Sequence, residues 1–321
     1  MTQTRRAFLS TSVLALAAGA VGRPRLAFAW PQQVPVPVTP VFTELRRGVG
    51  FFTGRGGTIG YLINAGGVVV VDAQFPDTAK ACLEGLNQRS LNRGVDRLIN
   101  THHHGDHTSG NVAFKGVAKK VVAHQRAAEL MREVEAAAVR AAASAAPGTP
   151  PPAPRAELLY PDTTFATTWQ ETIGDEVVSA KFYGAAHTSG DVAITFERAN
   201  VVHMGDLMFN RRHPVIDRPA GASIRNWASV VDAAAKDHAS DTLYIFGHAG
   251  GSVAVTGDRT DLALMREYLL ALLAWVGAEM KGGKSKDDII ANTAPLKGFD
   301  QHGPLNRTVL GNAYDELAAT A

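Results

Sequence analysis

Thr101-His102-His103-His104-Gly105-Asp106-His107 is the stretch of this 321-residue chain that decides its fold and its chemistry. Its last six residues hold four imidazoles and one carboxylate. A packed core would leave so many polar groups without partners, at a high cost in free energy, and a solvated turn has no need of four histidines. The apolar run that ends at Asn100 predicts a strand, so the stretch lies on the loop at the carboxyl end of that strand. We interpret it as part of a metal site.

Three further segments place metal donors after apolar, β-rich runs, each with a glycine nearby. They carry His187, Asp206 and His248. Because one loop cannot complete the ligand sets of two metals, we expect these donors to join it at one sheet edge. The chain has one cysteine, Cys82, which excludes an intrachain disulfide and a thiolate metal cluster. Nitrogen and carboxylate donors without sulfur favour zinc, with manganese or iron as alternatives.

The order H-x-H-x-D-H, then G-x-x-H-T, then G-D, then G-H resembles the metallo-β-lactamase superfamily, from the hairpin near Gly60 to about His248. The resemblance implies an α/β fold, the αββα metallo-β-lactamase sandwich, with the site along one edge of its two sheets. It implies two zinc ions per chain, and Asp72 matches the superfamily's strand-end aspartate, which supports the metal loop. The implied ligands are His102, His104 and His187 for one ion and Asp106, His107 and His248 for the other, with Asp206 bridging both.

This ligand set implies hydrolysis of a small-molecule substrate. Two metals can share a water and bring its pKa toward neutrality, and the resulting bridging hydroxide is the nucleophile. Asp106 is the expected catalytic residue, because it both ligates and orients the hydroxide. We expect an ester, thioester, lactone or amide as the substrate.

Two other activities of the same fold compete with this prediction. The first is a β-lactamase, but true β-lactamases of the superfamily usually carry Cys or Ser at the position of Asp206, whereas glyoxalase II and lactonase relatives carry the bridging aspartate. The second and weaker alternative is an iron-dependent sulfur dioxygenase, which the complete second ligand set opposes. A nuclease and a non-enzymatic binding protein are disfavoured further.

The amino-terminal residues predict export. Arg5 and Arg6 stand just before an uncharged apolar stretch, and Ala27-Phe28-Ala29 offers a small-x-small cleavage site. This pattern resembles a Tat signal, so we expect residues 1–29 to be a signal peptide, residues 30–321 to be a single domain, and the protein to be periplasmic or secreted. Without the four arginines of residues 1–29, 28 basic residues face 30 acidic ones, a net charge of about −2. That balance argues against nucleic-acid binding, and no later stretch predicts a membrane anchor.

Hydrophobic periodicity predicts alternating strands and helices. Cys82 lies on the apolar face of one predicted helix, so we expect it to be buried and inert. Residues 147–154 read as a proline-rich surface excursion rather than a domain linker. The expected strands are residues 60–64, 68–71, 97–100, 120–123, 177–183, 192–196, 201–204 and 243–246, and the expected helices begin at Pro76, span residues 125–145, surround Trp227 and cover residues 264–276.

The substrate is not readable from the sequence, because pocket loops determine it. We expect those loops to be residues 48–57 with Phe51 and Phe52, the segment 125–154, and the loop 209–227, in which Arg211 and Arg212 could hold a substrate carboxylate. His103 falls on a variable position of the motif and is expected to point toward the cleft or solvent. Residues 107–113 recur as 187–193, which suggests either coincidence or a duplicated strand-loop unit. The remaining histidines are expected to be structural or exposed: His124, His203, His213, His238 and His302, with His213 the best exception.

Overall fold

The computed structural model describes residue 39 and residues 41–144, 158–251 and 253–319 of the chain. The expected signal peptide, residues 1–29, and the proline-rich segment 147–154 lie outside the described residues. Within the described part, no helix is both long enough and apolar enough to cross a membrane.

Two large sheets form the centre of the fold. Strands β4 (Gly67–Val71), β5 (Val95–Asn100) and β6 (Ala118–His124) of the first sheet are parallel. Strands β11 (Val201–His203) and β13 (Leu243–Ile245) of the second sheet are parallel too. The first sheet has the order β1 (Val41–Arg46), β2 (Val49–Thr53), β3 (Ile59–Asn64), β4 (Gly67–Val71), β5 (Val95–Asn100), β6 (Ala118–His124) and β7 (Thr163–Phe165). The second has the order β15 (Thr256–Gly257), β13 (Leu243–Ile245), β11 (Val201–His203), β10 (Val192–Phe196), β9 (Glu176–Phe182) and β8 (Thr168–Ile173), and β12 (Phe209–Asn210) pairs with β14 (His248–Ala249).

Strand β4 shows why the sheets are covered on both faces. Side chains alternate along a strand, and all four valines of β4 are buried. Val69 and Val71 pack between the two sheets, in a cluster with residues of the second sheet such as Ile194. Val68 and Val70 face the other way and pack with Cys82 of helix α1. A strand that is apolar throughout therefore specifies two covering layers.

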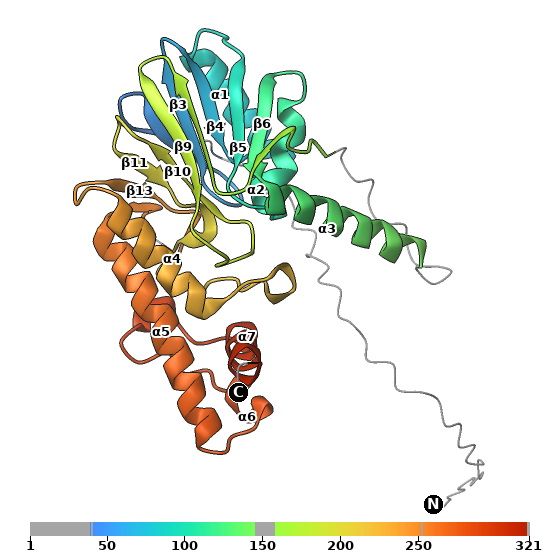
Figure 1. Ribbon diagram of the computed structural model, residues 1–321, viewed down its shortest axis with the longest axis vertical. Helices are drawn as coiled ribbons and strands as arrows, with labels where there is room; N and C mark the ends of the chain where they lie inside the picture. The colour runs from blue at the N-terminus through green and yellow to red at the C-terminus, as the bar shows by residue number, and fades with distance from the viewer. Residues whose placement is uncertain (1–38, 40, 145–157, 252, 320–321) are drawn as a thin grey trace, which may run out of the picture. The chain divides into compact units, whose positions relative to one another are not determined.

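The layers follow the order helix, sheet, sheet, helix, as predicted (Figure 1). Helix α1 covers the first sheet, and Cys82 is buried there as expected. Helices α4 and α5 cover the second sheet through a core that includes Trp227, Tyr244 and Leu269. The helices are α1 (Pro76–Arg89), α2 (Gly105–Thr108), α3 (Gln125–Ala143), α4 (Ile224–Asp237), α5 (Arg259–Lys281), α6 (Lys286–Ile290) and α7 (Arg307–Ala318), with 3-10 turns η1 (Ser109–Phe114), η2 (Gly205–Leu207), η3 (Arg218–Ala220) and η4 (Asp300–His302).

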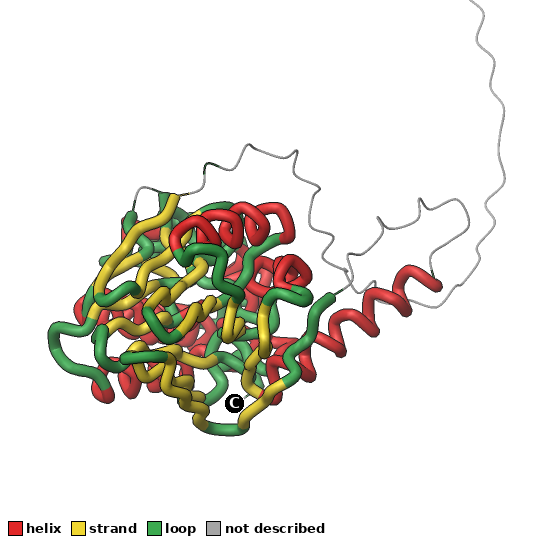
Figure 2. Tube along the Cα trace, turned by 90° about the horizontal axis from the view of Figure 1, so that it is seen from above, coloured by secondary structure: helices red, strands yellow, loops and turns green. Residues whose placement is uncertain are grey.

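Helix α3 is only partly packed. Leu130 and Met131 near its start are buried, whereas Val134 and Val139 are 54% and 56% exposed. Its second half extends away from the sheets, as the projecting helix in Figures 1 and 2 shows.

Two expectations about loops are wrong. Residues 49–53 form strand β2, and Phe51 and Phe52 are buried core residues rather than part of a pocket loop, because their apolar side chains are used on both faces of the first sheet. The repeated segment 107–113 also takes two different forms. Its first copy is helical, in α2 and η1, whereas its second copy runs through a bend into β10, so it is not a duplicated strand-loop unit.

Candidate active site

The donors predicted from the sequence meet where strands of the two sheets end. Strand β5 ends at Asn100, and the histidine-rich loop leads directly into the short helix α2. Strand β11 is followed by η2, which carries Asp206, and β13 is followed by His248 at the start of β14. His187 lies on the connection between β9 and β10. The seven predicted ligands thus come from four separate segments.

The first group consists of His102, His104, His187 and Asp206, whose ligand atoms all lie within 4.8 Å of one another. His187 Nε2 is 2.9 Å from His104 Nδ1. Oδ2 of Asp206 is 3.5 Å from His187 Nε2 and 3.9 Å from His102 Nε2. His102 Nε2 is buried and has no hydrogen-bond partner among the described residues. A buried nitrogen left without a partner is costly, and a metal ion in this group would satisfy it.

The second group consists of Asp106, His107 and His248, again with ligand atoms within 4.8 Å. His248 Nε2 is 3.1 Å from Asp106 Oδ2 and 3.4 Å from His107 Nε2. Asp206 also reaches this group, because its Oδ1 lies 3.0 Å from His107 Nε2. Its Oδ2 lies between the two groups, 3.4 Å from His248 Nε2 and 3.5 Å from His187 Nε2. The carboxylate of Asp206 therefore contacts both ligand groups.

The two groups differ in how their histidines titrate. Burial, together with neighbouring imidazoles, holds the pKa of His102 well below its usual value and lowers that of His187 to about 4. Both rings are thus neutral at pH 7, as metal ligands must be. In the second group, burial is outweighed by Asp206 and Asp106, which raise the pKa of His107 well above normal and that of His248 to about 9. A cation bound there would replace protons that now balance the carboxylates.

Asp72 fixes the orientation of His107. Its Oδ2 accepts from His107 Nδ1 at 2.8 Å, which leaves His107 Nε2 facing the site. Its Oδ1 accepts from the backbone N–H of Thr101 at 2.8 Å, and the hydroxyl of Thr101 donates to Oδ2 at 2.7 Å. The side chain is fully buried, and the residue has a φ of +64°, a conformation that aspartate tolerates better than most residues. This is the supporting role predicted for the strand-end aspartate.

Asp217 does the same for His104, a role that the sequence did not predict. Its Oδ2 lies 2.8 Å from His104 Nε2, which directs His104 Nδ1 toward the first group. Nearby, the carbonyl of Val215 accepts from His187 Nδ1 at 2.7 Å. Both partners, Asp217 and Val215, belong to the loop 209–227. Asp217 also accepts from Ala220 N as the cap of η3, so the turn signal was readable from the sequence, but the contact with His104 was not.

The remaining histidines are structural, as expected. His103, expected to point toward the cleft or solvent, is buried, which excludes the solvent alternative. His103 Nε2 lies 3.7 Å from Asp217 Oδ2, and burial lowers its pKa to about 3. His203 bonds the carbonyl of Thr58. His213 bonds the hydroxyl of Tyr268 and carbonyls near the carboxyl terminus, which excludes the site role considered for it. His124, His238 and His302 contact backbone, hydroxyl or aromatic groups.

The loop 209–227 lines the site, but through different residues than expected. Phe209 stacks on the ring of His248, with centroids 5.2 Å apart and planes at 20°. The ring of Trp227 lies 5.6 Å from that of His187. Arg211 is instead paired with Asp261 at 2.8 Å, which corrects the expectation that it holds a substrate carboxylate. Arg212 is exposed.

Two glycines allow the backbone to approach the ligands. A Cβ atom at Gly57 would lie 2.1 Å from the ring of His107, and one at Gly247 would lie 2.1 Å from Asp206 Oδ1. Neither distance is compatible with a side chain, so both positions require glycine for steric reasons. They explain the glycine noted beside His248.

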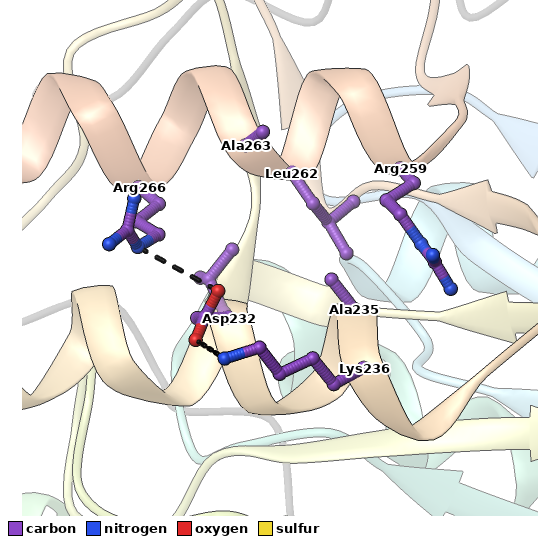
Figure 3. Close-up of a pocket in the computed structure, with 8 residues that line it drawn as sticks. Asp232, Ala235, Lys236, Arg259, Leu262, Ala263 and Arg266 are labelled. Atoms are coloured by element: carbon purple, nitrogen blue, oxygen red, sulfur yellow. Dashed lines mark hydrogen bonds and ion pairs between the residues drawn. The ribbon is translucent and has the colours of Figure 1, made fainter. Parts of the chain in front are cut away.

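A separate pocket of about 270 Å³ lies between α4 and α5 and includes no residue of either ligand group. Its floor is apolar, with Ala235 and Leu262, and its rim carries Asp232 between two cations (Figure 3). Asp232 pairs with Lys236 at 2.6 Å and with Arg266 at 3.8 Å. Arg259 also lines the pocket, so one carboxylate faces three cations there. Because no member of either ligand group lines it, the pocket is not the candidate active site.

Comparisons with known proteins agree with this geometry. The sequence pattern of the Metallo-beta-lactamase superfamily matches residues 52–258. The chain therefore belongs to the metallo-β-lactamase superfamily. No curated protein matches it in sequence.

Solved structures support the fold. The stereoselective inverting sec-alkylsulfatase Pisa1 from Pseudomonas sp. matches with a TM-score of 0.65 at 18% identity, over 86% of this chain and 50% of that chain. The chain thus spans half the length of that sulfatase. A metallo-beta-lactamase from Pontibacter korlensis matches with a TM-score of 0.55 at 19% identity, over 72% of this chain and 99% of that chain. One from Hirschia baltica matches with a TM-score of 0.54 at 15% identity, over 72% and 97%.

Proposed function

We propose that this protein is an exported dinuclear zinc hydrolase that cleaves an ester, thioester, lactone or amide bond in a small molecule. The observation that carries the proposal is the position of the Asp206 carboxylate, with Oδ2 3.5 Å from His187 Nε2 and Oδ1 3.0 Å from His107 Nε2. Oδ2 also lies 3.4 Å from His248 Nε2. A carboxylate in contact with both ligand groups is the arrangement expected of a bridging ligand. Seven donors are also too many for one tetrahedral zinc.

Each residue group has a proposed task. His102, His104 and His187 hold the first ion, and Asp106, His107 and His248 hold the second. When bound, the two ions supply a hydroxide nucleophile at neutral pH and polarise the scissile carbonyl. The residues hold this set in place: Asp72 orients His107, and Asp217 orients His104.

Asp106 is the proposed catalytic residue. Its side chain is 22% exposed, against 3% for Asp206, so it is the site carboxylate that an incoming water reaches. The imidazoles of His107 and His248 lower its pKa to about 2 although burial opposes this. It is therefore ionised at neutral pH and can accept a hydrogen bond that orients the attacking water.

Phe209 and Trp227 complete one side of the site with aromatic surface. Both side chains are buried, and they lie against His248 and His187. Apolar walls of this kind exclude water from the ligands and strengthen the electrostatic interactions among them.

The metal content of the mature protein tests the dinuclear part of the proposal. Gently purified protein should contain close to two equivalents of zinc, or of manganese or iron. A value of one that added zinc does not change would contradict the dinuclear assignment and revive a mononuclear iron enzyme.

A substrate panel tests the reaction. The panel comprises a lactone, a thioester, an aryl ester and a chromogenic cephalosporin, compared by kcat/KM at equal zinc. We expect the cephalosporin to be the poorest, because a bridging Asp206 partly fills the coordination position that would stabilise the departing amine nitrogen. A preference for the cephalosporin above about tenfold, which is about 1.4 kcal/mol of transition-state stabilisation, would make the chain a β-lactamase.

One observation favours a second candidate, the hydrolysis of an alkyl sulfate ester. The match to the sec-alkylsulfatase covers 86% of this chain, against 72% for the match to either β-lactamase. Counting two divalent ions, two carboxylates and one hydroxide leaves the proposed site with a net charge of about +1, which favours an anionic group. A secondary alkyl sulfate therefore belongs in the panel, and turnover of it alone would select this candidate.

Export is the remaining part of the proposal, and residues 1–29 motivate it. Replacing both Arg5 and Arg6 with Lys should trap the full-length precursor in the cytoplasm, because the twin arginine is the expected Tat signal. Cleavage after Ala29 should appear as the amino terminus of the exported wild-type protein. Normal export of the lysine variant would show that the arginines are not the signal.

A further inference from the structure

Helix α7 at the end of the described residues is attached to the loop that orients two of the proposed ligands. Asn312 Nδ2 donates to the carbonyl of Ile216 at 2.9 Å. One turn later, Glu316 Oε2 accepts from Arg218 Nη1 at 3.0 Å. These two contacts hold the loop on either side of Asp217.

Glu316 is also fixed from the other direction. Its Oε2 accepts from the backbone N–H of Ile224 at 2.7 Å, and its Oε1 accepts from that of Arg225 at 2.9 Å. These N–H groups lie at the start of α4, where a negative charge is stabilising. The side chain of Glu316 is 7% exposed. The hydroxyl of Ser223 also donates to Oε1, at 3.3 Å. A buried carboxylate with four donors fixes its surroundings closely.

The held segment is the one that supports the first ligand group. Val215 O accepts from His187 Nδ1, and Asp217 Oδ2 contacts His104 Nε2. The other oxygen of Asp217 accepts from Ala220 N at 3.2 Å, so the direction of the carboxylate depends on the shape of the turn. That turn is anchored by Arg218 and Ile216, the two residues that flank Asp217 and contact α7.

We propose that Asn312 and Glu316 of α7 act as positioning residues that set the metal affinity of the first ligand group, through Val215 and Asp217. The inference rests on the proposed metal assignment of His104 and His187. The inference gives a function to helix α7, which lies beyond residue 258, where the superfamily match ends. The contacts of both residues described above go to the loop and to the start of α4, so their effect on the ligands passes through the loop.

The test is a zinc titration of the full mature chain against a chromogenic chelator, with the two equivalents resolved. Glu316→Gln keeps the size of the side chain but turns one acceptor into a donor that faces N–H groups. We expect it to weaken one equivalent about tenfold and to leave the other within twofold. Asp315→Asn is the matched control on the same helix, because Asp315 pairs with the exposed Lys286 at 2.6 Å rather than with the loop.

A double-mutant cycle separates positioning from general destabilisation. If Glu316 acts through Asp217, the loss in Glu316→Gln/Asp217→Asn should be clearly smaller than the product of the two single losses. Ring ¹⁵N shifts of His104 in the metal-free protein give a second measurement. In the wild type they should report a proton on Nε2, and in Glu316→Gln a mixture of tautomers. Should Glu316→Gln fail to fold, Asn312→Ala removes only the contact with Ile216 and is measured in the same way.

Three results would overturn the inference: unchanged affinity for both equivalents, equal weakening of both, or independent effects of Glu316→Gln and Asp217→Asn. The wild-type titration alone decides the dinuclear assignment. If it gives one equivalent, the proposed function fails at that point, and the role of α7 is then judged by the change in that one affinity and by the tautomer of His104.

Discussion

The two sides of the site are supported by different parts of the molecule. On one side His107 is held by Asp72, and both side chains are fully buried at the end of β4. On the other side His104 is held by Asp217, and these side chains are 21% and 23% exposed. Asp72 is fixed by the sheet itself, whereas Asp217 lies on a loop that depends on α7. One ligand of the second group is thus held from the core, whereas one ligand of the first group is held by a loop that α7 supports.

The largest expected effect comes from removing the support inside the core. In Asp72→Ala, the N–H and hydroxyl of Thr101 and the Nδ1–H of His107 lose their buried acceptor. Alanine also fits the φ of +64° poorly. We expect the free energy of unfolding to fall by about 3–5 kcal/mol, measured by urea unfolding of the metal-free protein. Asp72→Asn, which keeps the shape and tolerates this φ, should lose less. If Asp72→Ala were as stable as the wild type, the support of His107 from within the core would be contradicted.

Removing Asp217, the support in the loop, should weaken metal binding more than it lowers the free energy of unfolding. We expect Asp217→Ala to weaken metal binding by the first group about 10- to 100-fold, as is typical when the partner of a ligating histidine is lost. Because the residue is partly exposed, the free energy of unfolding of the metal-free protein should change by only about 1 kcal/mol. Chelator competition and urea unfolding measure the two quantities. A loss of stability as large as that in Asp72→Ala would remove the distinction between the two sides.

Asp191, on the connection between β9 and β10 that carries His187, makes the stability of the fold sensitive to pH. Burial raises its pKa to about 6, although Thr188 donates to it from both N and Oγ1. A carboxyl group whose pKa is higher in the folded state contributes stability below its unfolded pKa of about 3.9, and that contribution is lost as the pH rises through 6. Relative to Asp191→Asn, the metal-free wild type should therefore lose on the order of 2 kcal/mol between pH 4 and 7. Urea unfolding across that range provides the measurement, and a pH-independent difference would refute the prediction.

The smallest effects belong to the arginine pair of the same loop. Arg211→Ala breaks the pair with Asp261 and should cost at most about 1 kcal/mol, because the pair is partly exposed. Metal content should be unchanged. Arg212→Ala should leave stability unchanged but raise KM severalfold for an anionic ester and not for a neutral one, because Arg212 is an exposed cation on the loop that lines the site. If Arg211→Ala raised KM in the same way, Arg211 would have the role first expected for it, which is to hold a substrate carboxylate.

The support of His107 could be predicted from the sequence better than the support of His104. The side built on the core was predictable, because the valine run before Asp72 and the motif from His102 to His107 are local patterns. The αββα layering was predicted from the resemblance to the superfamily, and strands that are apolar throughout, such as β4, fit it. These features depend on residues adjacent in sequence, where periodicity and residue type carry the information.

The loop side was not predictable in the same way. Asp217 supports His104 across 113 residues of sequence, and no local pattern marks such a contact. The role of Arg211 was predicted wrongly because its partner Asp261 lies 50 residues further along the chain, on α5. Phe51 and Phe52 were expected in a pocket loop, whereas both side chains are used by the core. In each case tertiary contacts, rather than local preference, decided the outcome.

The attachment of α7 to the loop has a consequence for the order of events during synthesis. The four histidines of residues 102–107 emerge early and can meet a metal while the rest of the chain is unfinished, but the seven donors are complete only at residue 248. The loop beneath His104 acquires its contacts later still, when Glu316 has been made. Contacts of such long sequence separation form slowly. We therefore expect stable metal loading to be a late step that reports a finished fold, so that a chain truncated before α7 would hold its metal loosely and be distinguishable from an intact one.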